Sequence, residues 1–277
     1  MMLEKQKWIL WIRVFAFRYP KTSFIGLMML FVCFGGLTFF LSLPNIGVMK
    51  DHYPVIEFKD DDAKSLLVQW KKEKPARWVG FQSISSYAKN AVRVSEDWEF
   101  YHHHGIDFTQ VRKVIDEKMD GEGDLRGAST ITQQLARNLF LHQRRSWMRK
   151  LQEFFLALRM ERAFGKDKIF EYYLNVVEWG PGVFGIRMAS YYYFDQHPNS
   201  LGPKEGAFLA MLLPSPIRYG VSFREKELTP YAQKTVNQIL DKMVMDGVLP
   251  RELAKEEKQR SLSFEYDPWR DYVEWDF

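Results

Sequence analysis

The stretch 126–138 reads Arg-Gly-Ala-Ser-Thr-Ile-Thr-Gln-Gln-Leu-Ala-Arg-Asn. Ser129 or Thr130 can serve as a helix N-cap, because a hydroxyl oxygen accepts a hydrogen bond from a free backbone N–H of the first turn. Apolar residues then recur at intervals of four, at Ile131, Leu135 and Leu139. This spacing places them on one helical face, so we predict an α-helix with that face buried.

Polar side chains of the same helix fall on its other side. They form a predicted row of hydrogen-bonding groups: Thr130, Gln133, Gln134 and Arg137. Small residues followed by a capped helix start also present free backbone N–H groups, which attract phosphate. An ordinary polar helix with its caps explains these residues equally well, and the pattern alone leaves both interpretations open.

Upstream, residues 96–107 read Glu-Asp-Trp-Glu-Phe-Tyr-His-His-His-Gly-Ile-Asp. The three consecutive histidines suggest a metal site, but successive side chains point about 100° apart on a helix and to opposite faces of a strand. They therefore cannot share one ion. For the carboxylates, a solvated or helix-capping cluster is the alternative to a catalytic site.

Downstream, basic residues surround one acid in the stretch 145–153. The set consists of Arg145, Arg149, Lys150 and Glu153. Arg149 and Glu153 are four residues apart, which is compatible with a surface pair worth about 0.3–0.5 kcal/mol. A carboxylate that organises several bases around a diphosphate is the other interpretation. We predict a helix over 146–164 with this core stripe: Trp147, Leu151, Phe154, Phe155 and Leu158.

The rest of the chain also favours helices. Helical patterns begin near Asp167, resume over 185–194, open again at Pro203 and end before Pro214. A further amphipathic segment carries Val236, Ile239, Leu240 and Met243. No series of alternating strands with tight turns is present, so the predicted fold class is mainly α.

The N-terminal region predicts a membrane anchor. No charge occurs from Ser23 to Leu43, and a helix of this length spans the roughly 30 Å hydrocarbon core of a bilayer. Five bases and one acid precede it, which places the N-terminus in the cytoplasm and the remainder outside. The alternative is a cleavable signal peptide, but the apolar run is long for one and no small-x-small cleavage site follows it.

These features divide the 277 residues into predicted segments. The N-terminal bases account for the whole net charge of +4, so the basic balance does not indicate nucleic acid binding. The only cysteine, Cys33, lies in the apolar run and cannot form an intrachain disulfide. The segments are a cytoplasmic basic segment (1–22), a transmembrane anchor (23–43), a juxtamembrane linker (44–77), a catalytic domain (78–250) and a C-terminal tail of unassigned role (251–277).

Together, the three clusters resemble the motifs of the peptidoglycan glycosyltransferase family, and the likeness extends over about 78–243. The pattern Glu-Asp-x-x-Phe-x-x-His-x-Gly-x-Asp is met by Glu96, Asp97, Phe100, His103, Gly105 and Asp107. Gly-x-Ser-Thr-Ile-Thr-Gln-Gln-Leu is unbroken from Gly127 to Leu135. Arg-Lys-x-x-Glu is met by Arg149, Lys150 and Glu153, and the fourth motif by Lys166, Ile169, Glu171, Tyr173, Leu174 and Asn175.

The resemblance implies a lysozyme-like helical domain with one N-terminal transmembrane helix, of the monofunctional type because no transpeptidase signature is present. Such an enzyme polymerises lipid II into glycan strands, forming β-1,4 links with inversion and releasing undecaprenyl diphosphate. Glu96 would be the general base and Glu153 the second catalytic carboxylate. The implied substrate and diphosphate ligands are Ser129, Thr130, Gln133, Gln134, Arg137, Arg145, Arg149, Lys150 and Asn175.

The resemblance also implies a setting for the enzyme. It places the catalytic domain on the outer side of the bacterial inner membrane, with lipid II, the nascent strand and other cell-wall synthesis or division proteins as partners. Whether Mg²⁺ or Mn²⁺ assists at the diphosphate stays open, with Glu153 as its candidate ligand. The sequence departs from the family at Arg137, where Lys is usual, and at Phe170, where Leu is common.

Two other functions are compatible with part of this pattern. A glycan hydrolase or lytic transglycosylase also uses a glutamate in a lysozyme-like fold, but it needs no diphosphate site such as the stretch 137–150 provides. An inactive scaffold of the cell-wall machinery would be expected to have lost motif residues, whereas here they are present. The polymerase is therefore the favoured interpretation.

Overall fold

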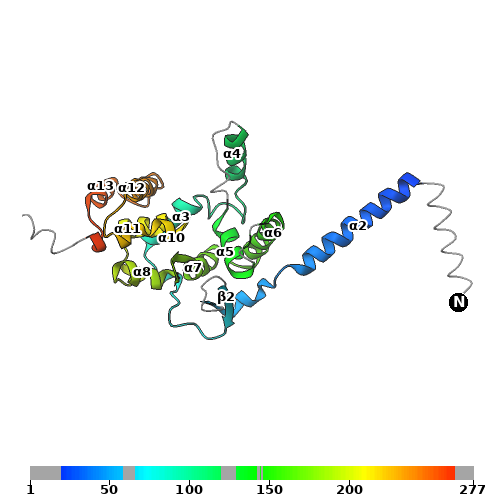
Figure 1. The fold of residues 1–277 in the computed structure, drawn as a ribbon, viewed down its shortest axis with the longest axis horizontal. Helices are drawn as coiled ribbons and strands as arrows, with labels where there is room; N and C mark the ends of the chain where they lie inside the picture. Colours follow the sequence, from blue (N-terminus) through cyan, green and yellow to red (C-terminus); the bar gives the residue numbers. More distant parts are fainter. Residues whose placement is uncertain (1–19, 59–65, 120–128, 142–143, 145, 266–277) are drawn as a thin grey trace, which may run out of the picture. The chain divides into compact units, whose positions relative to one another are not determined.

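The computed structural model describes residues 20–58, 66–119, 129–141, 144 and 146–265 (Figure 1). The chain divides into two compact units, Met1–Asn45 and Ile46–Phe277. In the first, helix α2 (Pro20–Ser42) is an apolar rod whose side chains are mostly exposed; Phe31 and Leu41 each retain 76% of their accessible surface.

The length and surface of α2 suit a lipid environment. Its 23 residues extend about 34 Å at the rise of an α-helix, enough to cross the hydrocarbon core of a bilayer. Within the described residues it is the one helix long and apolar enough to do so. The predicted membrane helix is therefore present at the expected place.

The second unit is mainly helical, as predicted. The elements, in chain order, are η1 (Ile46–Lys50), β1 (Tyr53–Phe58), β2 (Leu66–Lys71), η2 (Phe81–Ser83), α3 (Ser86–Glu96), α4 (Phe108–Met119), α5 (Ile131–Phe140), α6 (Trp147–Ala163), α7 (Lys166–Val176), β3 (Glu178–Gly180), β4 (Val183–Phe184), α8 (Ile186–Phe194), η3 (Pro198–Ser200), α9 (Pro203–Leu212), α10 (Pro216–Tyr219), α11 (Val221–Arg224), α12 (Pro230–Met245), α13 (Arg251–Gln259) and η4 (Ser263–Glu265).

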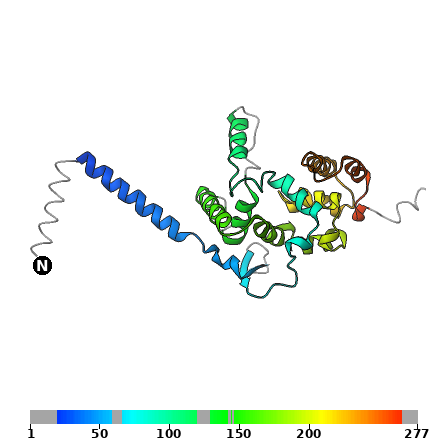
Figure 2. The ribbon, with the colours of Figure 1, turned by 180° about the vertical axis from the view of Figure 1, so that it is seen from behind.

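The core of this unit is built around α9. Every residue of α9 is buried, including Lys204 and Glu205 in its first turn; the remainder of the helix is apolar on all sides, as expected of a buried helix. It packs against α3 and α12, while α5 packs against α6 and α7. Figures 1 and 2 show these two groups of helices as neighbouring parts of the unit. The end of α3 and the start of α5 carry the first two motifs.

The predicted linker 44–77 contains regular structure. Strands β1 and β2 pair antiparallel, from Tyr53 opposite Lys71 to Phe58 opposite Leu66. The hairpin is anchored by Tyr172 on α7, whose hydroxyl donates to the carbonyl of His52 over 2.8 Å. The sequence-based prediction missed it because the run of three aspartates lies between the strands and interrupts the pattern.

The predicted C-terminal boundary at residue 250 also differs from the structure. Helix α13 follows it directly and packs on α12 and α9. Beyond α13, the buried ring of Phe264 lies against Phe208 of α9, with a centroid distance of 5.1 Å. The residues up to 265 therefore belong to the folded unit, and 266–277 lie outside the described residues.

The core face predicted for α6 is wrong. Trp147 is 75% exposed and Leu151 38% exposed, and Phe154, Phe155 and Leu158 are only half-buried. The buried residues of α6 are instead Glu153, Leu156, Ala157 and Met160. Both the predicted and the buried residues of α6 recur at helical spacing. The face that packs inward, however, is the one that carries the acid and the smaller side chains.

Candidate active site

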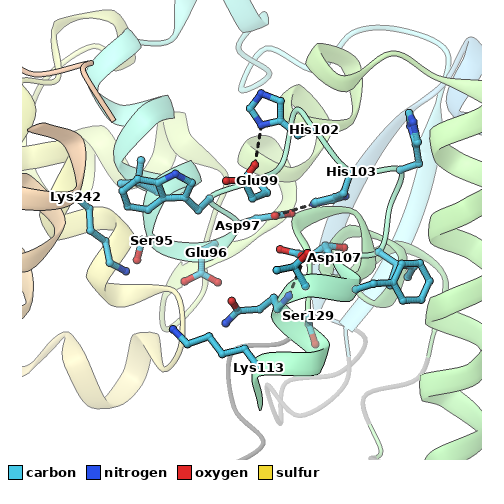
Figure 3. A pocket seen from close by; sticks show the side chains of 18 of the residues that line it. Ser95, Glu96, Asp97, Glu99, His102, His103, Asp107, Lys113, Ser129 and Lys242 are labelled. Carbon is cyan, nitrogen blue, oxygen red and sulfur yellow. Dashed lines mark hydrogen bonds and ion pairs between the residues drawn. The ribbon is translucent and has the colours of Figure 1, made fainter. Parts of the chain in front are cut away.

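Glu96 is the last residue of α3. The helix is held in place by buried Ala88, Ala91 and Val92, and α3 packs on α9. The chain leaves helical geometry at Asp97, so the Glu96 side chain projects from a helix end. It lines a hollow of about 950 Å³ between the α3–α4 connection, α4, the start of α5 and α12 (Figure 3).

The surroundings of Glu96 favour a protonatable carboxylate. Gln134 Nε2 donates to Glu96 Oε2 over 2.9 Å. Burial raises the pKa of Glu96 above its ordinary value of 4.5, and the charge of Asp97 acts in the same direction; Gln134, Arg137 and Lys242 oppose the rise. A carboxyl group with a raised pKa suits general acid–base chemistry near neutral pH.

The neighbouring carboxylate of Asp97 has a different environment. His103 Nε2 lies 2.8 Å from Asp97 Oδ1, and the Ile131 backbone N–H donates to Asp97 Oδ2 over 2.9 Å. The Gly105 N–H donates to His103 Nδ1 over 3.1 Å, so the neutral ring carries its proton on Nε2 and donates it to Asp97. Both Asp97 oxygens are therefore occupied, and this residue joins the motif loop to the N-terminus of α5.

The other residues of the first motif shape its turn. Phe100 is fully buried and packs on Phe170, while Asp107 Oδ1 accepts from the Gln110 N–H at the start of α4. Gly105 has a φ of 89°, and a Cβ there would lie 3.1 Å from the backbone of Ala157. A glycine is required at this point, because other residues rarely adopt that conformation and a side chain would meet α6.

Thr130 forms the predicted N-cap of α5 as part of a complete capping box with Gln133. The Thr130 hydroxyl also donates to the carbonyl of Gly105 over 2.7 Å. Both side chains are buried, which corrects the prediction of one open polar row. Only Gln134 and Arg137 of that row are half-buried rather than buried.

A second polar cluster connects α6 with the start of α5. Lys150 Nζ lies 2.8 Å from Ser129 Oγ and 3.0 Å from Glu153 Oε2, and Arg149 Nη1 lies 3.2 Å from Glu153 Oε1. Glu153 is 1% exposed, yet Lys150 remains half-exposed. Within the part of the chain that the structure describes, the buried Arg149 Nε has no hydrogen-bond partner. Two cations around one acid leave a net positive site that suits an anion.

Arg137 and Asn175 have surroundings other than this cluster. Arg137 lines a smaller hollow of about 160 Å³ together with Gln134 and Glu178, and within the described residues no hydrogen bond or ion pair engages its guanidinium. Asn175 is bonded to the backbone through both ends of its amide, at Val79 and Glu171, which gives it a structural role. Arg145 lies outside the described residues.

Comparison with known proteins identifies the family. The transglycosylase family model matches residues 63–244. The chain belongs to the peptidoglycan glycosyltransferase family. The helical unit is accordingly the lysozyme-like domain of this family, and the hollow beside Glu96 lies within the matched region.

Relatives from several bacteria carry the name biosynthetic peptidoglycan transglycosylase. One from Marinomonas sp. (strain MWYL1) is 44% identical over 152 residues, which is 55% of this chain and 67% of the relative. One from Shewanella denitrificans is 43% identical over 172 residues (62% and 73%), and one from Shewanella frigidimarina is 37% identical over 203 residues (73% and 88%).

Two lysines at the site escaped the motif-based prediction for this family member. Lys242 on α12 is half-buried and its charge acts on Glu96; Lys113 on α4 lines the same hollow (Figure 3). Lys242 lies three residues after the buried Ile239 and one before the buried Met243. A base at the edge of a buried helical face was a detectable signal, but its proximity to Glu96 depends on how α12 packs.

Proposed function

We propose that this enzyme polymerises lipid II into peptidoglycan glycan strands. In the proposed reaction, Glu96 removes the proton from the 4-hydroxyl of the acceptor GlcNAc while that oxygen attacks C1 of the donor MurNAc. The C1–O bond to undecaprenyl diphosphate breaks, the configuration at C1 inverts, and a β-1,4 link forms. The observation that carries the proposal is the carboxyl group of Glu96, which has a raised pKa at the wall of a large hollow.

The contrast between Glu96 and Asp97 supports Glu96 as the base. Asp97 has both oxygens engaged by Ile131 and His103. Among the described residues, the one hydrogen bond to the Glu96 carboxylate comes from the Gln134 amide. Its other oxygen is available to an acceptor hydroxyl. General base catalysis of this kind accelerates reactions by roughly 10² to 10⁴.

We assign the basic residues to stabilisation of the leaving diphosphate, which gains negative charge as the C1–O bond breaks. Lys150 and Arg149 each form an ion pair with the buried Glu153 carboxylate, and these contacts hold both side chains in position before the substrate binds. Fixed donors stabilise developing charge without reorganisation cost. Arg137 offers a further charge, and Arg145 adjoins the cluster in sequence. A hydrolase acting on finished glycan would have no use for these groups.

A divalent cation has few protein ligands in this site. The described residues contain no group of three His, Cys, Asp or Glu side chains that could hold a metal ion, and Glu153 is already paired with two bases. These residues do not by themselves form a Mg²⁺ or Mn²⁺ site. Glu153 is therefore assigned to the organisation of Arg149 and Lys150.

The apolar helix α2 fits a substrate with a polyprenyl tail. An anchor at the bilayer keeps the enzyme at the surface where such substrates lie. This raises the effective concentration of the substrates at the enzyme. The excess of bases before the helix supports a topology with the N-terminus in the cytoplasm and the catalytic unit on the outer side of the inner membrane.

The test is incubation of the purified full chain with lipid II in detergent, with and without Mg²⁺. Glycan polymer and undecaprenyl diphosphate should appear together. Preformed glycan strands, offered in parallel, should not be shortened. Shortening of those strands without polymer from lipid II would instead identify a hydrolase or lytic enzyme, and no reaction with either would favour a scaffold.

A further inference from the structure

A chain of three side chains runs from a buried tyrosine to the candidate base. Tyr173 on α7 is fully buried, and its hydroxyl donates to Gln134 Oε1 over 3.1 Å. The other end of the same amide, Nε2, donates to Glu96 Oε2 over 2.9 Å. Nε2 also lies 3.4 Å from the carbonyl oxygen of Ser129. Each end of the amide thus has a partner of the matching kind.

The direction of the amide matters because its two ends are opposite in hydrogen bonding. With Nε2 towards Glu96, the carboxylate receives a donor. If the amide were reversed, Oε1 would face Glu96, and only a protonated carboxyl group could bond to it. Burial raises the pKa of Tyr173 well above 10.0, so its hydroxyl keeps the proton that it donates.

The charged groups around Glu96 do not impose this direction. Asp97 lies beside it, the charges of Arg137 on α5 and Lys242 on α12 act on it, and Lys113 on α4 lines the same hollow (Figure 3). Glu205 of α9, which also packs on α3, is paired with Arg260. Within the described residues, the hydrogen-bond partners of the Gln134 amide are Tyr173, Ser129 and Glu96.

We propose that Tyr173 is a positioning residue for Glu96, because its hydroxyl holds the Gln134 amide with the N–H end towards the carboxylate. Tyr173 is fully buried, and its hydroxyl is bonded to Gln134, so it acts on Glu96 through that amide. In its absence the amide is held only at its Nε2 end, by Glu96 and the Ser129 carbonyl, and the fraction of enzyme with the donor correctly oriented towards an ionised carboxylate falls. The rate measurement rests on the proposed function; the unfolding measurement below does not.

The decisive variant is Tyr173→Phe in the full chain, since it keeps the buried ring and removes only the hydroxyl. We expect kcat to fall about 3- to 10-fold at neutral pH, the effect of losing one neutral hydrogen bond. The acid limb of the kcat profile should shift to higher pH, with KM nearly unchanged. Tyr172→Phe is the matched control, because the Tyr172 hydroxyl bonds to the backbone at Met49 and His52. Its acid limb should stay at the wild-type pH.

A second variant tests the link through the amide. Gln134→Met should shift the acid limb in the same direction, and adding Tyr173→Phe to it should cause no further shift, because the hydroxyl has lost the group through which it acts. A wild-type profile in Tyr173→Phe, or an equal further shift in the double variant, would overturn the proposal. If Tyr173→Phe does not fold, an unchanged acid limb in Gln134→Met overturns it.

A stability measurement separates this proposal from the proposed function. The difference in melting temperature between a protein and its Glu96→Gln variant, followed from pH 4 to 8, reports the proton affinity of Glu96 without any substrate. In the Tyr173→Phe background this difference should continue to grow to a higher pH than in the wild-type background. Identical curves would refute the positioning role, whatever the lipid II assay shows.

Discussion

Glu96 and Glu153 are two carboxylates of one helical unit whose surroundings differ in kind. Glu96 ends α3, receives a hydrogen bond from a neutral amide and faces a large hollow. Glu153 lies within α6, is 1% exposed and is in contact with two cations. A carboxylate next to neutral donors can take up a proton during a reaction. One that contacts two cations can instead hold their side chains in position.

The positions of the two residues in their helices reinforce the difference. The C-terminal end of α3 carries the negative end of the helix dipole, which disfavours a charged Glu96. Glu153 is reached by Arg149 and Lys150 from the preceding turn of its own helix. We therefore propose that the same residue type serves proton transfer in one place and organises an anion site in the other.

The largest effect is expected from Glu96→Gln, which removes the proposed base and keeps the hydrogen-bonding length. Turnover of lipid II should fall by about 10² to 10⁴, while donor binding changes little. Glycan synthesis and binding of labelled lipid II are the measurements. Full activity in this variant would remove Glu96 from the chemistry and end the distinction between the two acids.

The main effect of Glu153→Gln should be a lower free energy of unfolding. It leaves Arg149 and Lys150 without the charge that they surround, and breaking a buried ion pair costs on the order of 3 kcal/mol of unfolding free energy. Chemical denaturation in detergent would measure this, with Glu96→Gln as the comparison. Glu96→Gln should be as stable as the wild type or more stable at pH 7. Equal losses in both variants would contradict the contrast.

The pH dependence of stability should report the raised pKa of Glu96. Because the folded-state pKa of Glu96 is raised above 4.5, the folded protein binds the extra proton and loses stability as pH rises from 4.5 to that raised pKa. The stability advantage of Glu96→Gln over the wild type should therefore increase over this interval and then level off. If the stability difference between Glu96→Gln and the wild type stays constant from pH 4 to 8, burial does not raise the pKa of Glu96.

The smallest effect is expected from Lys242→Met. The charge of Lys242 opposes the rise in the pKa of Glu96, so its removal should move the acid limb of kcat upward by a few tenths of a pH unit, the size typical of a charge acting through solvent. Lys234→Met, at an exposed position on the same helix, is the control. An equal shift in both variants would indicate a general charge effect.

Much of the fold followed from local sequence patterns. The stripe Ile131, Leu135 and Leu139 is buried as predicted, and Thr130 is the N-cap of α5. The mainly α class and the N-terminal apolar helix, long enough to span a membrane, were also predicted correctly. These features depend on residues that are close in sequence, where helical periodicity and capping chemistry are sufficient.

The sequence by itself determined the mainly α class, the positions of several helices, the family motifs and Glu96 as the candidate base. Only the tertiary structure decided that α6 turns Glu153 inward and leaves Trp147 exposed, that Lys242 faces Glu96, and that Tyr173 reaches the Gln134 amide. The physical reason is that each of these depends on how one helix is rotated against another. Periodicity fixes which residues share a face, whereas packing fixes what that face meets.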